Sequence, residues 1–292
     1  MKVTRLPDLE RGGTRTVAVG TFDGVHLGHR RVIEGSESVL TFDPHPVSVV
    51  APQHTPRLLT TLPRKAELIA SLGVEELMVI PFDPDFASRS AASFIDDVLV
   101  GALGAVEVSI GENFRFGHRA QGDPELLRAD GRFRTVVHPL LEMDGEVVSS
   151  SHIRGLLQAG DVVEAGRLLG APFEVAGEVR HGDARGRLLG FPTANMVPLD
   201  GLAYPGHGVY ACLADGRPAA VSIGVRPTFT TGRAELIEAY ILDFDGDLYG
   251  SVLTVEFLER LRGERRFDSA EALVAQMQED VARTREIVAA PR

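Results

Sequence analysis

TFDGVHLGHRRVIEGSESVLTF, residues 21–42, connects one predicted strand to the next. The run TVAVGTF at 16–22 leads into it, and its last residues belong to the run SVLTFDP at 38–44. Both runs are apolar at consecutive positions, which is typical of parallel strands covered on both faces. Between them, Gly20 and Gly24 mark a turn, and VHLGH begins a short helix. The segment therefore predicts a strand–turn–helix–strand unit.

The rest of the first half continues this alternation of strands and helices. Further strands are expected at 76–83, 105–112 and 135–143, and helices at 63–73, 90–104, 151–158 and 161–169. Gly73 is expected to end the first of these helices and Ser90 to cap the second. Alternation of this kind predicts a doubly wound, Rossmann-like α/β domain.

The residue pattern changes after residue 171, where β-type runs are separated by glycine and proline. Long helices are missing until the C-terminus, so the pattern predicts a small, mostly antiparallel β-barrel. A final helix, capped by Asp268 or Ser269, carries one apolar stripe: Ala270, Leu273, Val274, Met277 and Val281. We therefore expect two domains, 1–171 and 172–292.

Composition narrows the class of protein. The formal net charge is −11, which argues against a nucleic-acid-binding protein and against attraction to an anionic membrane. Cys212 is the only cysteine, so an intrachain disulfide and a multi-cysteine metal site are excluded. No apolar run has the length of a signal peptide core or a membrane span. We expect a cytoplasmic protein with small-molecule partners, and no oligomeric state is predicted.

The turn at 20–29 has the features of a phosphate site. A helix N-terminus presents free N–H groups and the positive end of its dipole, and glycine lets backbone approach a ligand. His26 and His29 are three residues apart, so they share a face of the first helical turn and can donate to phosphate oxygens. The alternative is a capped helix with two ordinary polar residues. A zinc site is disfavoured because no further His/Cys cluster lies nearby.

A second group of residues lies in RHGDARGRLLGFPTANM, residues 180–196. Thr193 and Asn195 alternate, so on an extended strand both would point the same way. A hydroxyl and an amide carbonyl are hard oxygen ligands, which suit Mg²⁺ carrying ATP phosphates. The preceding loop offers glycines and arginine for anionic oxygen, namely Gly182, Arg185, Gly186 and Gly190. A glycine–arginine loop alone is more often just an exposed hairpin.

Several motifs occur in one order along the chain. GTFDGVHLGH, TFDPHP at 41–46, IGENFRFG at 110–117 and VSSSHIR at 148–154 resemble the N-terminal module of bacterial bifunctional riboflavin kinase/FAD synthetases. GFPTAN, GVY, SIGVRPTF at 222–229, IEAYILDFDGDLYG and LRGERRFDS resemble the riboflavin kinase module that follows it. Ser151 replaces a usual threonine, and Ser222 stands where many relatives have asparagine.

The resemblance to the first module implies adenylyl transfer, in which the phosphate of FMN attacks the α-phosphate of ATP. His26, His29 and Arg154 would then be catalytic, stabilising charge on the ATP phosphates. Asn113 would bind flavin. The remaining residues at matching positions would bind ATP or its phosphates: Gly20, Phe22, Asp23, Gly24, Ser150 and Ser151. The reaction needs positioning and charge neutralisation rather than a protein nucleophile.

The resemblance to the second module implies that Glu238 is the base for phosphorylating riboflavin. Without the resemblance, Glu238 reads as a solvent-facing residue of an alternating strand. Thr193 and Asn195 would hold Mg²⁺, the loop glycines and Arg185 would meet ATP, and Arg262 and Phe267 would shape the flavin site. The second module would thus produce FMN, and the first module would convert that FMN to FAD.

The crossover between the first two strands is short. Nine residues, 29–37, separate Gly28 from Ser38, whereas a helix returning along a five-residue strand of about 17 Å needs about eleven. Three explanations are open: a genuinely shortened helix, a missing segment, or a degenerate first half. The alternatives to a bifunctional enzyme are therefore a riboflavin kinase with an impaired adenylyltransferase half, or a non-catalytic flavin- or nucleotide-binding regulator.

Overall fold

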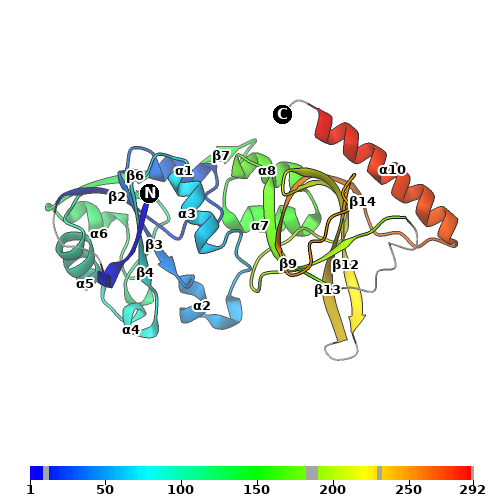
Figure 1. Cartoon of the computed structure of the whole chain (residues 1–292). Coiled ribbons are helices and arrows are strands. Elements are labelled where there is room, and N and C mark those ends of the chain that lie inside the picture. The colour runs from blue at the N-terminus through cyan, green and yellow to red at the C-terminus, as the bar shows by residue number, and fades with distance from the viewer. Residues whose placement is uncertain (9–12, 182–189, 229–231, 291–292) are drawn as a thin grey trace. The chain divides into compact units, whose positions relative to one another are not determined.

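The computed structural model describes residues 1–8, 13–181, 190–228 and 232–290. The chain forms two compact units, Met1–Ser150 and Ser151–Arg292 (Figure 1). The second unit therefore includes the helical stretches that precede the barrel. The boundary predicted at residue 171 marks the change from alternating strands and helices to β-type runs, and it does not coincide with the limit of the compact units. As a boundary between functional modules it stays a prediction.

The first unit contains a six-stranded, all-parallel sheet in the order β1-β4-β3-β2-β5-β6. Its strands are β1 (Lys2–Arg5), β2 (Arg15–Val19), β3 (Ser38–Asp43), β4 (Glu76–Pro81), β5 (Ala105–Gly111) and β6 (Arg134–His138). A small hairpin, β7 (Glu142–Met143) and β8 (Glu146–Val147), follows. The doubly wound prediction is confirmed, with β1 added as an edge strand beside β4.

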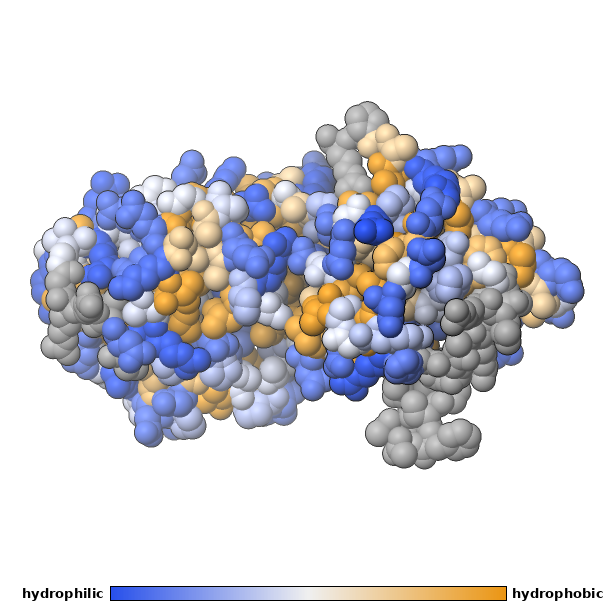
Figure 2. All heavy atoms as spheres, viewed as in Figure 1, coloured by the Kyte–Doolittle hydropathy of each residue, from blue (hydrophilic) through white to orange (hydrophobic). Residues whose placement is uncertain are grey.

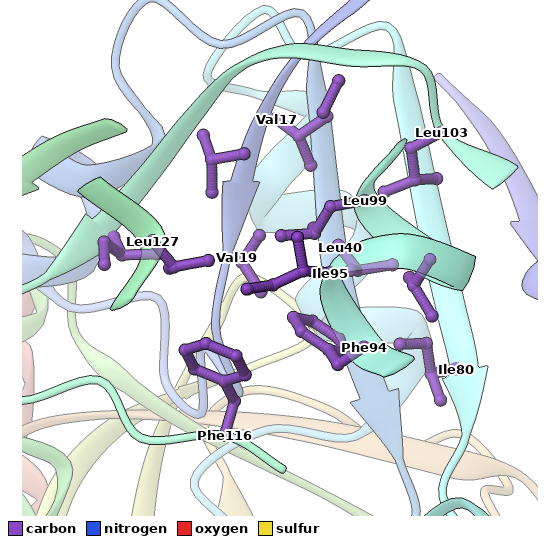
Figure 3. Close-up of a cluster of buried hydrophobic side chains, with 14 of the residues drawn as sticks. Val17, Val19, Leu40, Ile80, Phe94, Ile95, Leu99, Leu103, Phe116 and Leu127 are labelled. Atoms are coloured by element: carbon purple, nitrogen blue, oxygen red, sulfur yellow. The ribbon is translucent and has the colours of Figure 1, made fainter. Parts of the chain in front are cut away.

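Helices cover both faces of this sheet. They are α1 (Leu27–Ile33), α2 (Pro46–Val50), α3 (Leu62–Ala70), α4 (Pro84–Ala87), α5 (Ala91–Ser93), the π-helix η3 (Phe94–Ala102) and α6 (Pro124–Ala129). Three short 3₁₀ turns complete the unit: η1 (Leu6–Asp8), η2 (Pro52–His54) and η4 (His118–Ala120). Side chains alternate along a strand, so successive strand residues pack into the hydrophobic cores on opposite faces of the sheet. Ala18 and Val39 pack with α1 and α3, whereas Val17 and Leu40 pack with η3 and α6 (Figure 3).

The helix expected at 90–104 has two parts. Ser90 is its N-cap, as predicted, and accepts a hydrogen bond from the Ser93 amide at 3.1 Å. From Phe94 the chain continues as a π-helix, and the Leu103 amide bonds back five residues to the Val98 carbonyl at 2.9 Å. The apolar residues still reach the core, because Phe94, Leu99 and Leu103 are all buried.

The short crossover closes without strain on its length, so the estimate that it falls short was wrong. Ser38 pairs with Val17, only two residues before β2 ends at Val19. The chain must therefore return about 7 Å rather than the length of a whole strand. The seven residues of α1 rise about 10 Å. The nine-residue connection is therefore long enough to link the two strands.

A hydroxyl from the sheet anchors α1. Ser109 on β5 is buried, donates to the Val32 carbonyl at 2.6 Å and lies 2.9 Å from His138 Nε2. Burial lowers the pKa of His138, which favours the neutral ring. Ser109 thus connects the end of the short helix to β5 and β6.

Replacing Ser109 by alanine should lower the stability of the first unit by about 1–3 kcal/mol, because a buried carbonyl loses its partner. Ser71→Ala is the matched control, since that hydroxyl bonds the Leu68 carbonyl at an exposed helix end. Differential scanning calorimetry should show the first unit melting earlier only in Ser109→Ala. Equal shifts in both variants would contradict the anchoring role.

The second unit begins with two helices, α7 (Ser150–Ala159) and α8 (Val162–Leu169), and then forms a closed barrel. The barrel strands are β9 (Phe173–Arg180), β10 (Ala194–Pro198), β11 (Gly208–Ala214), β12 (Arg217–Thr228), β13 (Gly232–Ile241) and β14 (Val252–Arg262). They pair antiparallel in the order β10-β13-β12-β11-β14-β9. The predicted antiparallel barrel is confirmed.

The C-terminal helix α10 (Ala270–Ala289) packs on β11, β12 and β14. Ser269 is its N-cap, and its hydroxyl accepts from the Ala272 amide at 3.2 Å. The expected stripe is only half-buried at Leu273, Val274, Met277 and Val281, and Ala270 is exposed. Asp280 and Thr284 are instead the buried residues of this helix. Polar contacts therefore contribute to holding it against the barrel.

Hydrophilic side chains cover most of the face seen in Figure 2, with hydrophobic ones in scattered groups. Among the described residues, no helix combines the length and apolar character needed to cross a membrane.

Candidate functional sites

The first site lies where the direction of the parallel sheet changes. From β2 the chain moves to β3 and β4 on one side, whereas β5 and β6 lie on the other. Ligands of doubly wound folds bind at the carboxyl ends of the strands on either side of such a switch point. The turn 20–26 follows the carboxyl end of β2, and Asn113 follows that of β5 as an exposed turn residue. The predicted phosphate-binding turn and the predicted flavin residue thus follow neighbouring strands.

Several hydrogen bonds hold this turn in an unusual backbone conformation. Phe22, Gly24 and Val25 all have positive φ, at 47°, 88° and 42°. Such conformations are sterically unfavourable for residues other than glycine and persist only where their surroundings fix them. Asp23 is buried, and its carboxylate accepts from the amides of Leu59 and Thr60 at 2.9 and 3.2 Å.

Two further bonds complete the turn. The Ser150 hydroxyl donates to the Asp23 carbonyl at 2.9 Å, and the Thr60 hydroxyl accepts from the Gly24 amide at 3.2 Å. Gly20 is required for a different reason, because a Cβ there would meet the Phe22 ring at 2.9 Å. The structure therefore brings together Gly20, Phe22, Asp23, Gly24 and Ser150, which shape the turn. Their contact with ATP stays a prediction.

The two histidines lie against each other at the start of α1. Their ring centroids are 3.5 Å apart and the planes differ by 18°. His26 is the N-cap, and its Nδ1 accepts from the His29 amide at 3.2 Å. This bond places the proton of a neutral His26 on Nε2. The Phe22 ring meets His29 edge-on at 5.4 Å.

His29 is held as a neutral base. Burial lowers its pKa well below the usual value, and the neighbouring His26 and Lys65 lower it further. Its Nδ1 atom is buried and has no hydrogen-bond partner within the described part of the chain. A buried nitrogen without a partner is rare in folded proteins and is available to a ligand or a proton.

Ser151 and Arg154 lie on α7, one exposed and the other half-buried. Both belong to the second compact unit, whereas the histidines belong to the first. The ATP-binding role predicted for Ser151 and the catalytic role predicted for Arg154 stay predictions.

The second site is a row of side chains across three neighbouring strands of the barrel. Glu238 on β13 pairs directly with Asn195 on β10 and with Ser222 on β12. Directly opposed residues project to the same face of a sheet, about 5 Å apart at their Cβ atoms. Ile237 and Ala239, on either side of Glu238, are buried in the barrel, so this row lies on its outer face. The structure thus brings the predicted base next to a predicted metal ligand.

Thr193 lies just before β10 and is half-buried. The FPTAN segment is fixed by Phe191, whose ring contacts Tyr240 at 5.2 Å between centroids. Tyr240 is two residues beyond Glu238, so this contact secures the approach of β10 to the Glu238 strand. Gly190 has a φ of +84° and open space beside its Cα, which suits a loop end. Gly182, Arg185 and Gly186 lie outside the described residues.

Arg262 and Phe267 are brought together near the same barrel strands. The guanidinium lies 5.6 Å from the Phe267 ring centre. Arg262 also makes a two-pronged ion pair with Asp280 of α10, with its Nε 3.1 Å and its Nη2 2.8 Å from Oδ2. Asp280 is buried, so the ion pair is largely desolvated. Arg262 continues the row as well, because it pairs with Val209, which is opposite Ser222.

A family model described as riboflavin kinase matches residues 169–288, and one described as FAD synthetase matches residues 10–152. Bifunctional riboflavin kinase/FMN adenylyltransferases are similar over nearly the whole chain. The protein from Listeria monocytogenes is 37% identical over 93% of this chain and 91% of its own length, and that from Bacillus subtilis 38% over 93% and 92%.

The chain belongs to the bifunctional riboflavin kinase/FMN adenylyltransferase family. A solved structure described as "Crystal Structure of Macrolide-efflux Protein from Streptococcus pneumoniae" has the same fold, with a TM-score of 0.89 and 31% identity. It covers 98% of this chain and 99% of its own. The efflux activity in that description is not carried to this chain, because both family models name flavin chemistry.

The structure also brings out three residues that the sequence did not identify as site residues: Lys65, Ser222 and Asp280. Ser222 was noted only as a departure from the family pattern, and the pairing of β12 with β13 places it beside Glu238. Asp280 follows Leu273 by seven residues and Met277 by three, so it interrupts the apolar stripe of α10. Lys65 does the same in α3, between Leu62 and Ile69. A charged residue within an apolar stripe was the signal that could have found both.

Replacing Asp280 by alanine leaves the Arg262 guanidinium without its carboxylate and should weaken riboflavin binding. Loss of one partner of this largely buried ion pair should also lower the stability of the second unit by about 1–3 kcal/mol. Glu279→Ala is a control on the exposed side of the same helix. Riboflavin titration and calorimetry should separate the two variants, and equal riboflavin affinity in both would show that Asp280 does not position Arg262.

Proposed function

We propose that this chain phosphorylates riboflavin to FMN at the barrel and adenylylates FMN to FAD at the α/β unit, using magnesium-bound ATP for both reactions. The observation that carries the proposal is the row of Asn195, Glu238 and Ser222 on adjacent strands. Family membership supplies the two reactions, and the row and the stacked histidines supply a place for each.

In the kinase reaction, Glu238 takes the proton of the terminal ribityl hydroxyl of riboflavin. That oxygen then attacks the γ-phosphorus of ATP, the bond to the β-phosphate breaks, and ADP leaves. Asn195 and Ser222 flank Glu238, so they position the base and the groups that meet it. Arg262, fixed by Asp280, lies beside Phe267 and is placed to contact the flavin.

The residues present fit a magnesium ion. Asn195 is 7% exposed and carries a neutral amide oxygen. Thr193 adds a second neutral oxygen two residues away, and such oxygens with phosphate and water complete the ligand set that Mg²⁺ prefers. Bound there, the ion would neutralise charge on the phosphates. A protein-only site of three or more His, Cys, Asp or Glu side chains is absent from the described ranges.

In the adenylyl transfer, a phosphate oxygen of FMN attacks the α-phosphorus of ATP and pyrophosphate leaves. No protein nucleophile is needed, because FMN provides it. In this mechanism His26 and His29 donate hydrogen bonds to the phosphates as charge develops, and the fixed turn reduces the reorganisation that this requires. Asn113, after the neighbouring strand, is placed to contact flavin or phosphate.

Asn195→Ala should raise the Mg²⁺ concentration needed for half-maximal riboflavin phosphorylation by on the order of tenfold or more. Val197→Ala, on the exposed side of the same strand, is the control and should behave as wild type. The measurement is the initial rate of FMN formation across a magnesium titration, with EDTA as the zero point. An unchanged magnesium requirement in Asn195→Ala would remove this residue from the proposed metal site.

A further inference from the structure

Lys65 is a buried lysine beside the histidine turn that neither the motifs nor the proposed mechanism uses. It lies on α3, is 7% exposed, and its Nζ donates to the Thr21 carbonyl at 2.7 Å. Lysine is seldom buried unless its charge is paired. Its neighbours are two carboxylates from two different motifs, Asp23 of the turn and Asp43 of the TFDPHP segment.

Lysine is rare in this chain, which sets Lys65 apart from the other cationic residues. Only Lys2 and Lys65 are lysines, whereas the remaining 28 of the 30 cationic residues are arginines. Lys2 is exposed at the edge strand β1. Lys65 is therefore the one buried lysine of a chain whose other cationic residues are nearly all arginine. Lysine presents a compact ammonium with three donors, whereas arginine presents a larger planar guanidinium.

We propose that Lys65 is a positioning residue of the adenylyltransferase site: by holding the Thr21 carbonyl it fixes the turn that carries His26 and His29, so FAD synthesis depends on it and riboflavin phosphorylation does not. The inference rests on the proposed function of the first unit.

The Thr21 carbonyl accepts the hydrogen bonds that fix the start of the turn. It also accepts from the Thr41 hydroxyl at 3.1 Å, and it immediately precedes Phe22, the first residue with positive φ. Lys65 and Thr41 therefore fix the entry to the turn, as Ser150 and Thr60 fix its middle. A displacement of about 1 Å at catalytic groups can lower a rate by about a hundredfold.

The charge of Lys65 also acts on His29. Burial lowers the pKa of Lys65, while Asp23 and Asp43 raise it. The ammonium, in turn, lowers the pKa of His29 together with burial and His26. Removing the ammonium should therefore raise the pKa of His29. The acid limb of the pH profile of FAD synthesis should move to higher pH as His29 becomes easier to protonate.

The test compares Lys65→Met, Thr41→Val and the control Lys2→Met in the full-length chain. Thr41→Val removes the other donor to the same carbonyl without changing charge. For each variant, FAD formation from FMN and FMN formation from riboflavin are measured in the same preparation. Imidazole NMR titration gives the pKa of His29, identified by its loss in His29→Ala.

Lys65→Met should lower kcat for FAD formation by about 10- to 100-fold, leave riboflavin phosphorylation within twofold and raise the His29 pKa. Thr41→Val should lower FAD formation a few-fold and leave the His29 pKa in place. Lys2→Met should match wild type in every measurement.

The inference is overturned if Lys65→Met makes FAD at the wild-type rate, or loses FAD formation with no change in the His29 pKa, which would make Lys65 a packing residue only. If the Lys65→Met first unit does not fold, a wild-type rate in Thr41→Val overturns the step through the Thr21 carbonyl. Failure of the wild-type chain to form FAD would instead contradict the proposed function, and the His29 titration would still judge the charge effect.

Discussion

Glu238→Gln should reduce riboflavin phosphorylation by about a hundredfold to ten-thousandfold, because the substitution keeps the size of the side chain and removes its ability to accept a proton. Glu238 pairs with Asn195 and Ser222 on the neighbouring strands. Glutamine should keep this strand pairing, so the loss of activity would come from the missing carboxylate. FAD formation from added FMN should continue at the wild-type rate, because the α/β unit does not contain this residue.

A strand glutamate outside the row provides the control for this variant. Glu178 on β9 lies opposite Val197 and Val252 and pairs with Arg180 at the surface. Glu178→Gln should phosphorylate riboflavin normally. If Glu238→Gln also did so, the carboxylate would not be the base, and the mechanism of the kinase half would have to be abandoned.

The double variant His26→Ala, His29→Ala should form FAD at least about a hundredfold more slowly, since removal of one preorganised donor to developing charge costs about two to three orders of magnitude. Starting from riboflavin, this variant should accumulate FMN. The two imidazoles are stacked at 3.5 Å, so their combined loss removes a single surface rather than two independent groups.

Loss of the cap complicates this variant, because His26 Nδ1 accepts the His29 amide. Alanine there should cost about 1 kcal/mol of stability, whereas asparagine retains a capping oxygen. His26→Asn with His29→Ala should therefore restore stability without restoring FAD formation. Recovery of FAD formation in that variant would show that the cap matters and the imidazoles do not.

Much of this architecture follows from local pattern. Consecutive apolar residues predicted the parallel strands. Short β-type runs separated by glycine and proline, with no long helix until the C-terminus, predicted the barrel. The pairing of Glu238 with Asn195 could not be predicted from spacing, since 42 residues of sequence separate them and only strand order and register bring them together.

The errors have physical causes as well. The crossover at 29–37 is shorter than a helix that returns along a whole strand, but the register of Ser38 with Val17 sets a smaller distance. Lys65 and Asp280 are hard to predict as buried residues because charged residues on amphipathic helices are usually solvated. In both helices the 3.6-residue period places the charge on the buried face.

A flavin time course with the wild-type chain, ATP and Mg²⁺ shows whether one chain carries out both reactions. Starting from riboflavin, FMN should appear first with ADP, and then decline as FAD accumulates with pyrophosphate. A reaction that stops at FMN, with no FAD even when FMN is supplied, would contradict the claim that one chain carries both reactions.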